Sequence, residues 1–242
     1  MDSSDGQEHL GTRHLQGKLG ERSIRSGLVQ SLSRGGRTLL EVAATMILAR
    51  LLTPKAFGLI GMVATVTGLV EMFKDMGLSA ATVQRESISH SQVTTLFWIN
   101  AGVSVLLTLL TVGMAPILAW FYQEPRLVEI TIGFSLPILF SGLSVQHKAL
   151  LRRQMRFNIL ASLKFVTISL ALAVALSLAV EDYGYWALVA RAIVSSAGMM
   201  AGVWIFCRWR PGAVKWAAGS KELLSFGGHL AGFNVVNYLA RN

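Results

Sequence analysis

Charged side chains inside otherwise apolar sequence are the feature of this chain that could carry chemistry. Between residues 26 and 85, two apolar runs each carry a polar stripe. At about 100° per residue, the first stripe falls within an arc of roughly 80° and consists of Gln30, Arg34, Arg37, Glu41 and Thr45. A charge inside the hydrocarbon of a membrane costs about 2.5–3.5 kcal/mol, so such residues usually face a bundle interior or a water-filled cavity. The spacing therefore predicts that this arc lines a cavity.

The second polar stripe lies on the next apolar run and is interpreted in the same way. It gathers on one side of the next apolar run and consists of Thr67, Gly68, Glu71, Lys74 and Asp75. Six charged residues from the two stripes are the candidate cavity-lining, substrate-binding residues: Arg34, Arg37, Glu41, Glu71, Lys74 and Asp75.

Each charged group also has an alternative reading. Arg34 and Arg37 could snorkel to the membrane surface. Glu41 could pair with Arg37 four residues earlier, or it could be a proton-coupling carboxylate. The three charges of the second stripe could form an interfacial ion cluster that fixes helix packing. Polar residues elsewhere in the runs, Asn100 and His147 among them, are expected to make interhelical hydrogen bonds.

Composition places the chain among membrane proteins with several spans. Hydrophobic residues make up 52% of its 242 residues and charged residues only 14%, against about 25% in a soluble domain. Several apolar runs reach the length of about 20 residues that a transmembrane helix needs. The net charge of +9 does not indicate nucleic-acid binding, because the basic residues cluster in short loops between the apolar runs.

The apolar runs predict an all-α polytopic fold. Six transmembrane helices are expected at about 27–51, 56–76, 93–115, 127–149, 159–180 and 186–207, and a seventh starts near residue 223. Thr53 and Pro54 are a good N-cap and first helical residue, and Pro116 and Pro137 predict kinks or breaks. The expected organisation is a polar tail (1–22), a six-helix lobe (23–208), and a basic loop with the start of a second lobe (209–242).

Loop charge predicts the orientation. The loops after the second, fourth and sixth runs are rich in Lys and Arg, including the 148–156 loop. The loops after the first, third and fifth runs hold only Lys55 and Arg126 as basic residues, beside acidic ones. By the positive-inside rule the N-terminus and the even-numbered loops are expected to be cytoplasmic.

Signatures of catalysis are missing from the sequence. Cys207 is the single cysteine, so neither an intrachain disulfide nor a cysteine metal cluster is expected. No Walker, HExxH or GxSxG motif is present. We therefore expect a protein that is not an enzyme and that uses no cofactor or metal.

Four segments carry a family resemblance: ILARLLTPKAFGLIGMV (47–63), KDMGLSAATVQRE (74–86), TLFWINAG (95–102) and APILAWFYQEPRL (115–127). They resemble polysaccharide biosynthesis membrane proteins of the oligosaccharide flippase (Wzx-like) type, in the multidrug/oligosaccharidyl-lipid/polysaccharide exporter superfamily. The resemblance covers about residues 22–242. It implies a bacterial inner-membrane protein that flips polyprenyl-diphosphate-linked oligosaccharide for lipopolysaccharide or exopolysaccharide synthesis. The family has twelve or more helices in two lobes around a cavity, about twice the length of this chain.

The resemblance also gives the charged stripes a ligand. A diphosphate is bound by Arg or Lys donors, and Arg is better suited to bidentate contact. The resemblance therefore implies that Arg34 and Arg37 contact the diphosphate of the headgroup. The implied partners are the lipid-linked oligosaccharide, the phospholipid bilayer and a polysaccharide polymerase or glycosyltransferases, without nucleic acid. Two alternatives stay open. One is a cation-coupled drug antiporter using Glu41 and Glu71, and the other is a non-transporting scaffold or fragment that lacks the second lobe.

Overall fold

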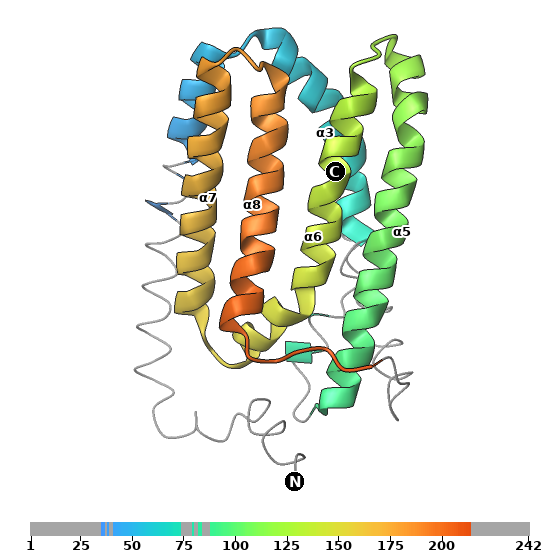
Figure 1. The fold of residues 1–242 in the computed structure, drawn as a ribbon, viewed down its shortest axis with the longest axis vertical. Coiled ribbons are helices and arrows are strands. Elements are labelled where there is room, and N and C mark those ends of the chain that lie inside the picture. The colour runs from blue at the N-terminus through green and yellow to red at the C-terminus, as the bar shows by residue number, and fades with distance from the viewer. Residues whose placement is uncertain are drawn as a thin grey trace, which may run out of the picture.

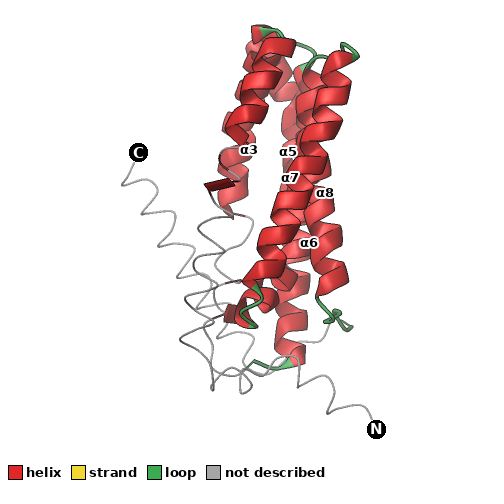
Figure 2. Ribbon diagram, turned by 90° about the vertical axis from the view of Figure 1, so that its left-hand side faces the viewer, coloured by secondary structure: helices red, strands yellow, loops and turns green. Residues whose placement is uncertain are grey.

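The computed structural model describes residues 41–73 and 88–213, together with residues 35, 36, 38, 79, 82 and 83. This part is helical, joined by turns (Figure 2). Its helices are α3 (Pro54–Phe73), α5 (His90–Tyr122), α6 (Leu127–Arg153), α7 (Phe157–Val180) and α8 (Tyr185–Phe206). Helical residues 41–51 precede α3. The predicted all-α class is confirmed, whereas the tail (1–22) and the start of a second lobe near residue 223 lie outside the described residues.

The helices form two layers. The order α7, α8, α6, α5 makes one row, and helical residues 41–51 and α3 lie behind it (Figure 1). Short turns connect α5 to α6, α6 to α7 and α7 to α8, so helices that follow one another in the sequence run antiparallel. Apolar side chains from both layers meet where residues 41–51 and α3 pack against α7 and α8, at Leu48, Leu52, Ala56, Ala175, Ala179, Ala187 and Leu188.

Four of the helices, α5 to α8, are long and apolar enough by length and composition to cross a membrane. Their outward side chains are large and apolar, as lipid contact requires; Leu109 is 63% exposed and Val166 is 59% exposed. The chain is therefore a multi-pass membrane protein.

Local sequence sets where the helices begin. The first helical residue of α3 is Pro54, as predicted. The start of α5 is a capping box, in which Gln92 N donates to Ser89 Oγ at 3.3 Å and Ser89 N donates to Gln92 Oε1 at 3.1 Å. This reciprocal pair satisfies two backbone N–H groups that a helix start otherwise leaves open.

Of the kink or break predicted at Pro116, the break is wrong. The helix α5 runs for 33 residues through Pro116, and α6 runs likewise through Pro137. Residues 117–122 after Pro116 are apolar. In hydrocarbon only a helix satisfies the backbone polar groups of such a stretch, so losing one hydrogen bond at a proline costs less than ending the helix there.

The expected 148–156 loop is also shorter than predicted. The helix α6 continues to Arg153, so Lys148, Arg152 and Arg153 are helical. Arg153 is only 8% exposed, and its Nη1 donates to the carbonyl oxygen of Thr82 at 3.1 Å. Basic side chains in a last helical turn are favoured by the helix dipole, and the apolar residues between them keep this turn packed.

Small residues let the helices approach closely. A Cβ atom at Gly142 of α6 would overlap the side chain of Ser104 of α5, and one at Gly202 of α8 would overlap that of Leu163 of α7. Without a hydrophobic driving force between helices in lipid, such close packing is a main source of their association. The glycines therefore allow α5 to pack closely on α6, and α7 on α8.

Candidate functional site

The six predicted site residues are only partly within the described structure. Arg34, Arg37, Lys74 and Asp75 lie outside the described residues, and Glu71 is placed in α3 without a description of its side chain. Glu41 is half-buried, and its backbone carbonyl accepts a hydrogen bond from Thr45 Oγ1 at 2.8 Å. The cavity-lining role of the six remains a prediction, as does the pairing of Glu41 with Arg37.

The helix that follows, α3, has two contrasting faces. Leu59 and Val63 are buried against Leu127, Ile130 and Val189 of the row in front. The exposed positions on its other side are all small or polar: Gly58, Gly61, Ala64, Thr65 and Gly68. We call these five residues the small face of α3.

The small face differs from the lipid-facing surfaces of the same protein. The other helices expose large apolar side chains, such as Met46 before α3, Leu109 on α5 and Phe165 on α7. Among the side chains of α3 that the structure describes, none of the exposed ones is large and apolar. A Cβ atom at Gly58, Gly61 or Gly68 would meet open space. The small face therefore has the composition of a surface that contacts something other than lipid tails.

One member of the predicted second stripe does not belong to this surface. Thr67 is buried, and its hydroxyl donates to the carbonyl oxygen of Val63 at 3.1 Å. Its neighbour Gly68 is exposed. The prediction that Thr67 and Gly68 face the same side is wrong for Thr67, because its hydroxyl is satisfied within the helix and its side chain packs in the bundle.

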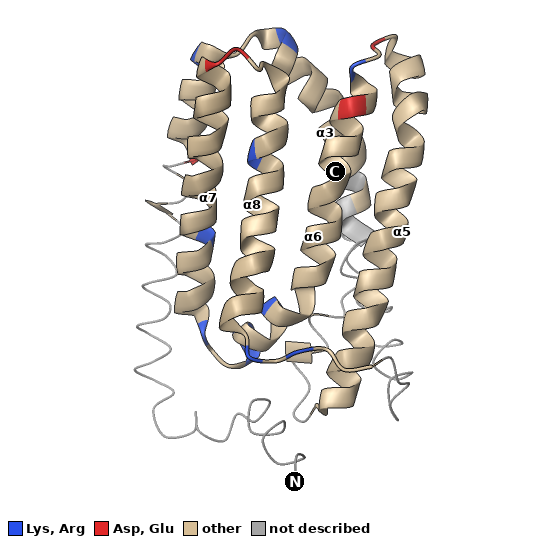
Figure 3. Cartoon of the chain, viewed as in Figure 1, with Lys and Arg blue, Asp and Glu red and all other residues tan. Residues whose placement is uncertain are grey.

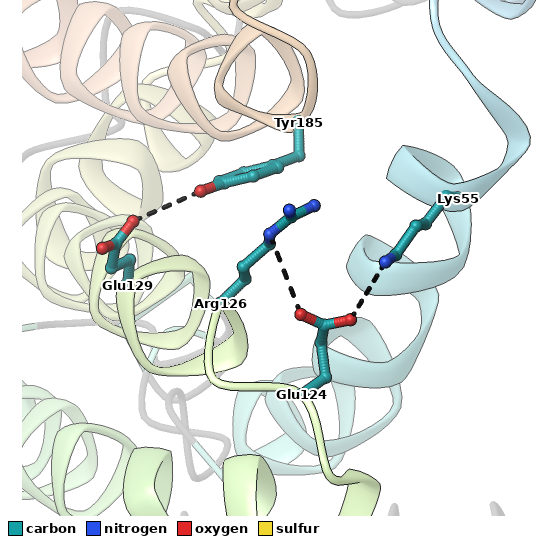
Figure 4. Close-up of polar contacts among 5 residues, drawn as sticks. All are labelled: Lys55, Glu124, Arg126, Glu129 and Tyr185. Atoms are coloured by element: carbon teal, nitrogen blue, oxygen red, sulfur yellow. Dashed lines mark hydrogen bonds and ion pairs between the residues drawn. The ribbon is translucent and has the colours of Figure 1, made fainter.

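A polar network anchors the start of α3 at one end of the bundle (Figure 4). Lys55 Nζ lies 3.3 Å from Glu124 Oε2, and Arg126 Nε lies 3.8 Å from Glu124 Oε1. Nearby, the hydroxyl of Tyr185 donates to Glu129 Oε2 at 3.3 Å. Lys55 is thus an ion-pair partner of the α5–α6 turn. These contacts tie α3 to the turn before α6, and α6 to the start of α8.

Arg191 is a candidate that the sequence reasoning missed. It is the single charged residue of α8 and lies two turns into that helix, about 9 Å from its start. Its side chain is half-buried, and among the described residues it has no hydrogen bond or ion pair. A charged residue inside a span is a functional candidate by default. The signal was the lone arginine in the apolar run YWALVARAIVSSAGMM.

Two buried polar residues differ from the prediction that they make interhelical hydrogen bonds. Asn100 of α5 is fully buried, yet neither amide atom has a hydrogen-bond partner among the described residues. His147 of α6 is also fully buried and stacks on Trp204, with ring centroids 4.4 Å apart. Interhelical hydrogen bonds therefore do not account for Asn100, and ring packing against α8 is the main contact of His147.

Comparison with known proteins adds independent information. A model of the family described as "Polysaccharide biosynthesis protein" matches residues 47–242. The chain is 28% identical over 209 residues to teichuronic acid biosynthesis protein TuaB of Bacillus subtilis, covering 85% of this chain and 43% of that protein. It is 26% identical over 202 residues to lipopolysaccharide biosynthesis protein WzxC of Escherichia coli, covering 81% and 40%.

A third relative is succinoglycan biosynthesis transport protein ExoT of Rhizobium meliloti, 28% identical over 209 residues and covering 86% of this chain and 42% of that protein. The chain thus spans less than half the length of each of these curated relatives. No solved structure matches the chain significantly.

Proposed function

Because the chain belongs to the polysaccharide biosynthesis protein family, we propose that it takes part in flipping a polyprenyl-diphosphate-linked oligosaccharide across the bacterial inner membrane. The relatives are named for the biosynthesis of teichuronic acid, lipopolysaccharide and succinoglycan, and one of them as a transport protein. The family description also names polysaccharide biosynthesis, which favours a role in moving a lipid-linked sugar precursor rather than a drug.

The observation that carries the proposal is the small face of α3. A sugar-bearing headgroup crosses a bilayer only along a hydrated path, whereas a helix surface in contact with lipid tails is favoured by large apolar side chains. Glycine, alanine and threonine leave room for a bulky headgroup. The Thr65 hydroxyl donates to the carbonyl oxygen of Gly61 at 3.0 Å, and its oxygen can still accept a hydrogen bond. We therefore assign the small face to one wall of the transport path.

In this proposal Arg34 and Arg37 supply donors for the diphosphate, Glu41 neutralises or positions them, and Glu71, Lys74 and Asp75 also line the path. Arg contacts phosphate oxygens in a bidentate manner, which gives both strength and orientation. The relatives are more than twice as long as the matched segment. We propose that the opposite wall comes from a second lobe, which a second copy of this chain would have to supply in the test below.

Complementation tests the proposal. The chain is expressed in a bacterium that lacks its own oligosaccharide flippase, and surface polysaccharide is measured at equal membrane abundance. We expect restoration by the wild type and loss on Gly61→Leu, since a leucine on the small face narrows the path. The matched control is Gly113→Leu on the exposed surface of α5, where an added side chain also meets open space.

Two results would count against the proposal. If a stably inserted wild-type chain restores no surface polysaccharide, the chain does not carry out the transport by itself. If Gly61→Leu and Gly113→Leu have the same effect, the small face is not part of the path. The double variant Arg34→Ala/Arg37→Ala distinguishes the role of the first stripe from that of α3, because it removes the proposed phosphate donors and leaves the sequence of α3 unchanged.

A further inference from the structure

A short extended segment after α8 closes one end of the bundle. Residues 207–213, here called the crossing segment, run from the end of α8 across α6 to α5 (Figure 1). The indole of Trp98 donates to the carbonyl oxygen of Gly212 at 3.0 Å, and the imidazole Nε2 of His90 lies 3.1 Å from that of Arg210. The segment is thus fixed against α5 by backbone contacts.

The side chains of this segment alternate between inside and outside. Cys207 and Trp209 are buried in an apolar cluster with Phe97 of α5, whereas Arg208 and Arg210 are exposed. Successive side chains of an extended backbone point to opposite faces. The order Cys-Arg-Trp-Arg therefore turns two arginines outward while the residues beside them anchor the backbone.

A third arginine reaches the same place from the α6–α7 turn. Arg156 Nη1 donates to the carbonyl oxygen of Phe206 at 3.3 Å, and Arg210 Nη1 donates to that of Cys207 at 2.6 Å. Two guanidinium groups are therefore bound to consecutive carbonyls at the C-terminal end of α8. The guanidinium carbon of Arg210 also lies 5.8 Å from the ring centroid of Trp204.

Acidic residues do not compensate these charges. Neither Arg156 nor Arg210 forms an ion pair in the part of the chain that the structure describes. The acidic residues of the described turns lie at the opposite end of the bundle (Figure 3): Glu124, Glu181 and Asp182. Each guanidinium has five N–H donors and uses only Nη1 in these carbonyl contacts. Free donors on two fixed, exposed cations are what a phosphate group binds.

We propose that Arg156 and Arg210, with Arg208 beside them, bind the phosphate of an anionic phospholipid headgroup. The site lies where α6 and α8 leave the apolar span and α7 begins, which is the level of the headgroups. Trp204 and Phe206 next to it have the aromatic character of a membrane interface. The carbonyl contacts hold the guanidinium groups in place before the lipid arrives, which lowers the entropy cost of binding. The proposal does not rest on the transport function.

The test is a calorimetric titration of the purified 242-residue chain in neutral detergent with short-chain phosphatidylglycerol. Phosphatidylcholine and inorganic phosphate are the comparison probes. We expect phosphatidylglycerol to bind about tenfold or more tightly than phosphatidylcholine. Because a surface cation contributes about fivefold to the affinity for an anionic membrane, Arg156→Gln/Arg210→Gln should weaken phosphatidylglycerol binding about ten- to thirtyfold.

The matched control is Arg152→Gln/Lys164→Gln, which removes two exposed positive charges from the same half of the bundle. It should weaken phosphatidylglycerol binding by a smaller factor than Arg156→Gln/Arg210→Gln, because neither residue belongs to the pair held on the carbonyls of Phe206 and Cys207. Unfolding temperatures measured without lipid verify that the variants fold. The variant Arg156→Lys/Arg210→Lys keeps the positive charge and should bind phosphatidylglycerol with intermediate affinity. Equal binding of the two phospholipids, or equal losses in both Gln pairs, would overturn the site. Inorganic phosphate binding as tightly as phosphatidylglycerol would overturn its assignment to a lipid.

Discussion

Arginine occupies three different environments in the described part of the chain. Arg153 is buried and hydrogen-bonded to a backbone carbonyl, Arg156 is exposed at the end of the bundle, and Arg191 is half-buried inside a span. The same residue type thus serves packing in one place, and is a candidate for ligand binding in two others. The burial of each arginine and its hydrogen-bond partners distinguish these roles, because the charge of the side chain is the same in each case.

The single cysteine provides a clean probe of the closed end of the bundle. Cys207 is 2% exposed, and burial raises the pKa of its thiol above the ordinary value. A raised pKa leaves less of the reactive thiolate at a given pH. We expect maleimide labelling at pH 8 to be at least about tenfold slower in the folded protein than in denaturing detergent. Equal labelling rates in the two conditions would show that the crossing segment does not bury this thiol.

Close packing between α5 and α6 can be tested at one glycine. Gly142→Ala forces the added methyl group into the side chain of Ser104, and overpacking of this kind costs about 1–3 kcal/mol. We expect a lower unfolding temperature of the purified protein in detergent. Gly113→Ala, on the open side of α5, should leave the unfolding temperature unchanged or raise it, since alanine is the better helix former. A neutral Gly142→Ala would contradict the close contact.

At the scale of elements, α3 is the helix whose two faces differ most in kind. One face is apolar and packs on α6 and α8, while the other combines glycine, alanine and threonine. The network around Glu124 holds the start of this helix against the α5–α6 turn. Since Lys55 is 63% exposed there, this ion pair orients the helix and contributes little to stability.

Water access to the small face of α3 is a direct prediction. In a Cys207→Ala background, Thr65→Cys should react with a water-soluble maleimide about tenfold or more faster than Leu109→Cys, because a thiol ionises in water and not among lipid tails. Both positions are exposed, and Leu109 lies on the apolar surface of α5. Comparable rates at the two positions would place the small face in the lipid.

At the scale of the whole molecule, the acidic residues of the described turns lie at one end of the bundle, together with Lys55 and Arg126, whereas the turns at the other end carry basic residues. The turns at one end carry Glu124, Glu181 and Asp182, and the other end carries Arg152, Arg156, Arg208 and Arg210 (Figure 3). The positive-inside rule then predicts that the arginine-rich end faces the cytoplasm.

Labelling in cells tests this orientation. In the Cys207→Ala background, a membrane-impermeant maleimide should label Glu181→Cys in cells with a permeable outer envelope. It should label Asn158→Cys, at the start of α7, only after the inner membrane is opened. Both native residues are exposed. The reverse pattern would invert the topology and move the proposed phospholipid site to the outer leaflet.

The sequence by itself determined the all-α membrane class and the family of this protein, together with the bounds of α7 and α8. Hydrophobic length and loop charge are local quantities, so α7 and α8 began and ended within two residues of their predicted bounds. The candidate site residues on α3 and before it were predicted from the same local periodicity. Of these, Glu41 is half-buried in the structure, whereas the roles of Arg34 and Arg37 stay predictions.

Only the tertiary structure decided which side of each helix is covered. Neighbours far apart in sequence bury Arg153 beside the exposed Arg152 and leave the small face of α3 open. They also bring Arg156 to the end of α8, next to Arg210. A helical period gives the residues that share a face, but not the helix that packs on that face, because packing depends on contacts that no local window contains.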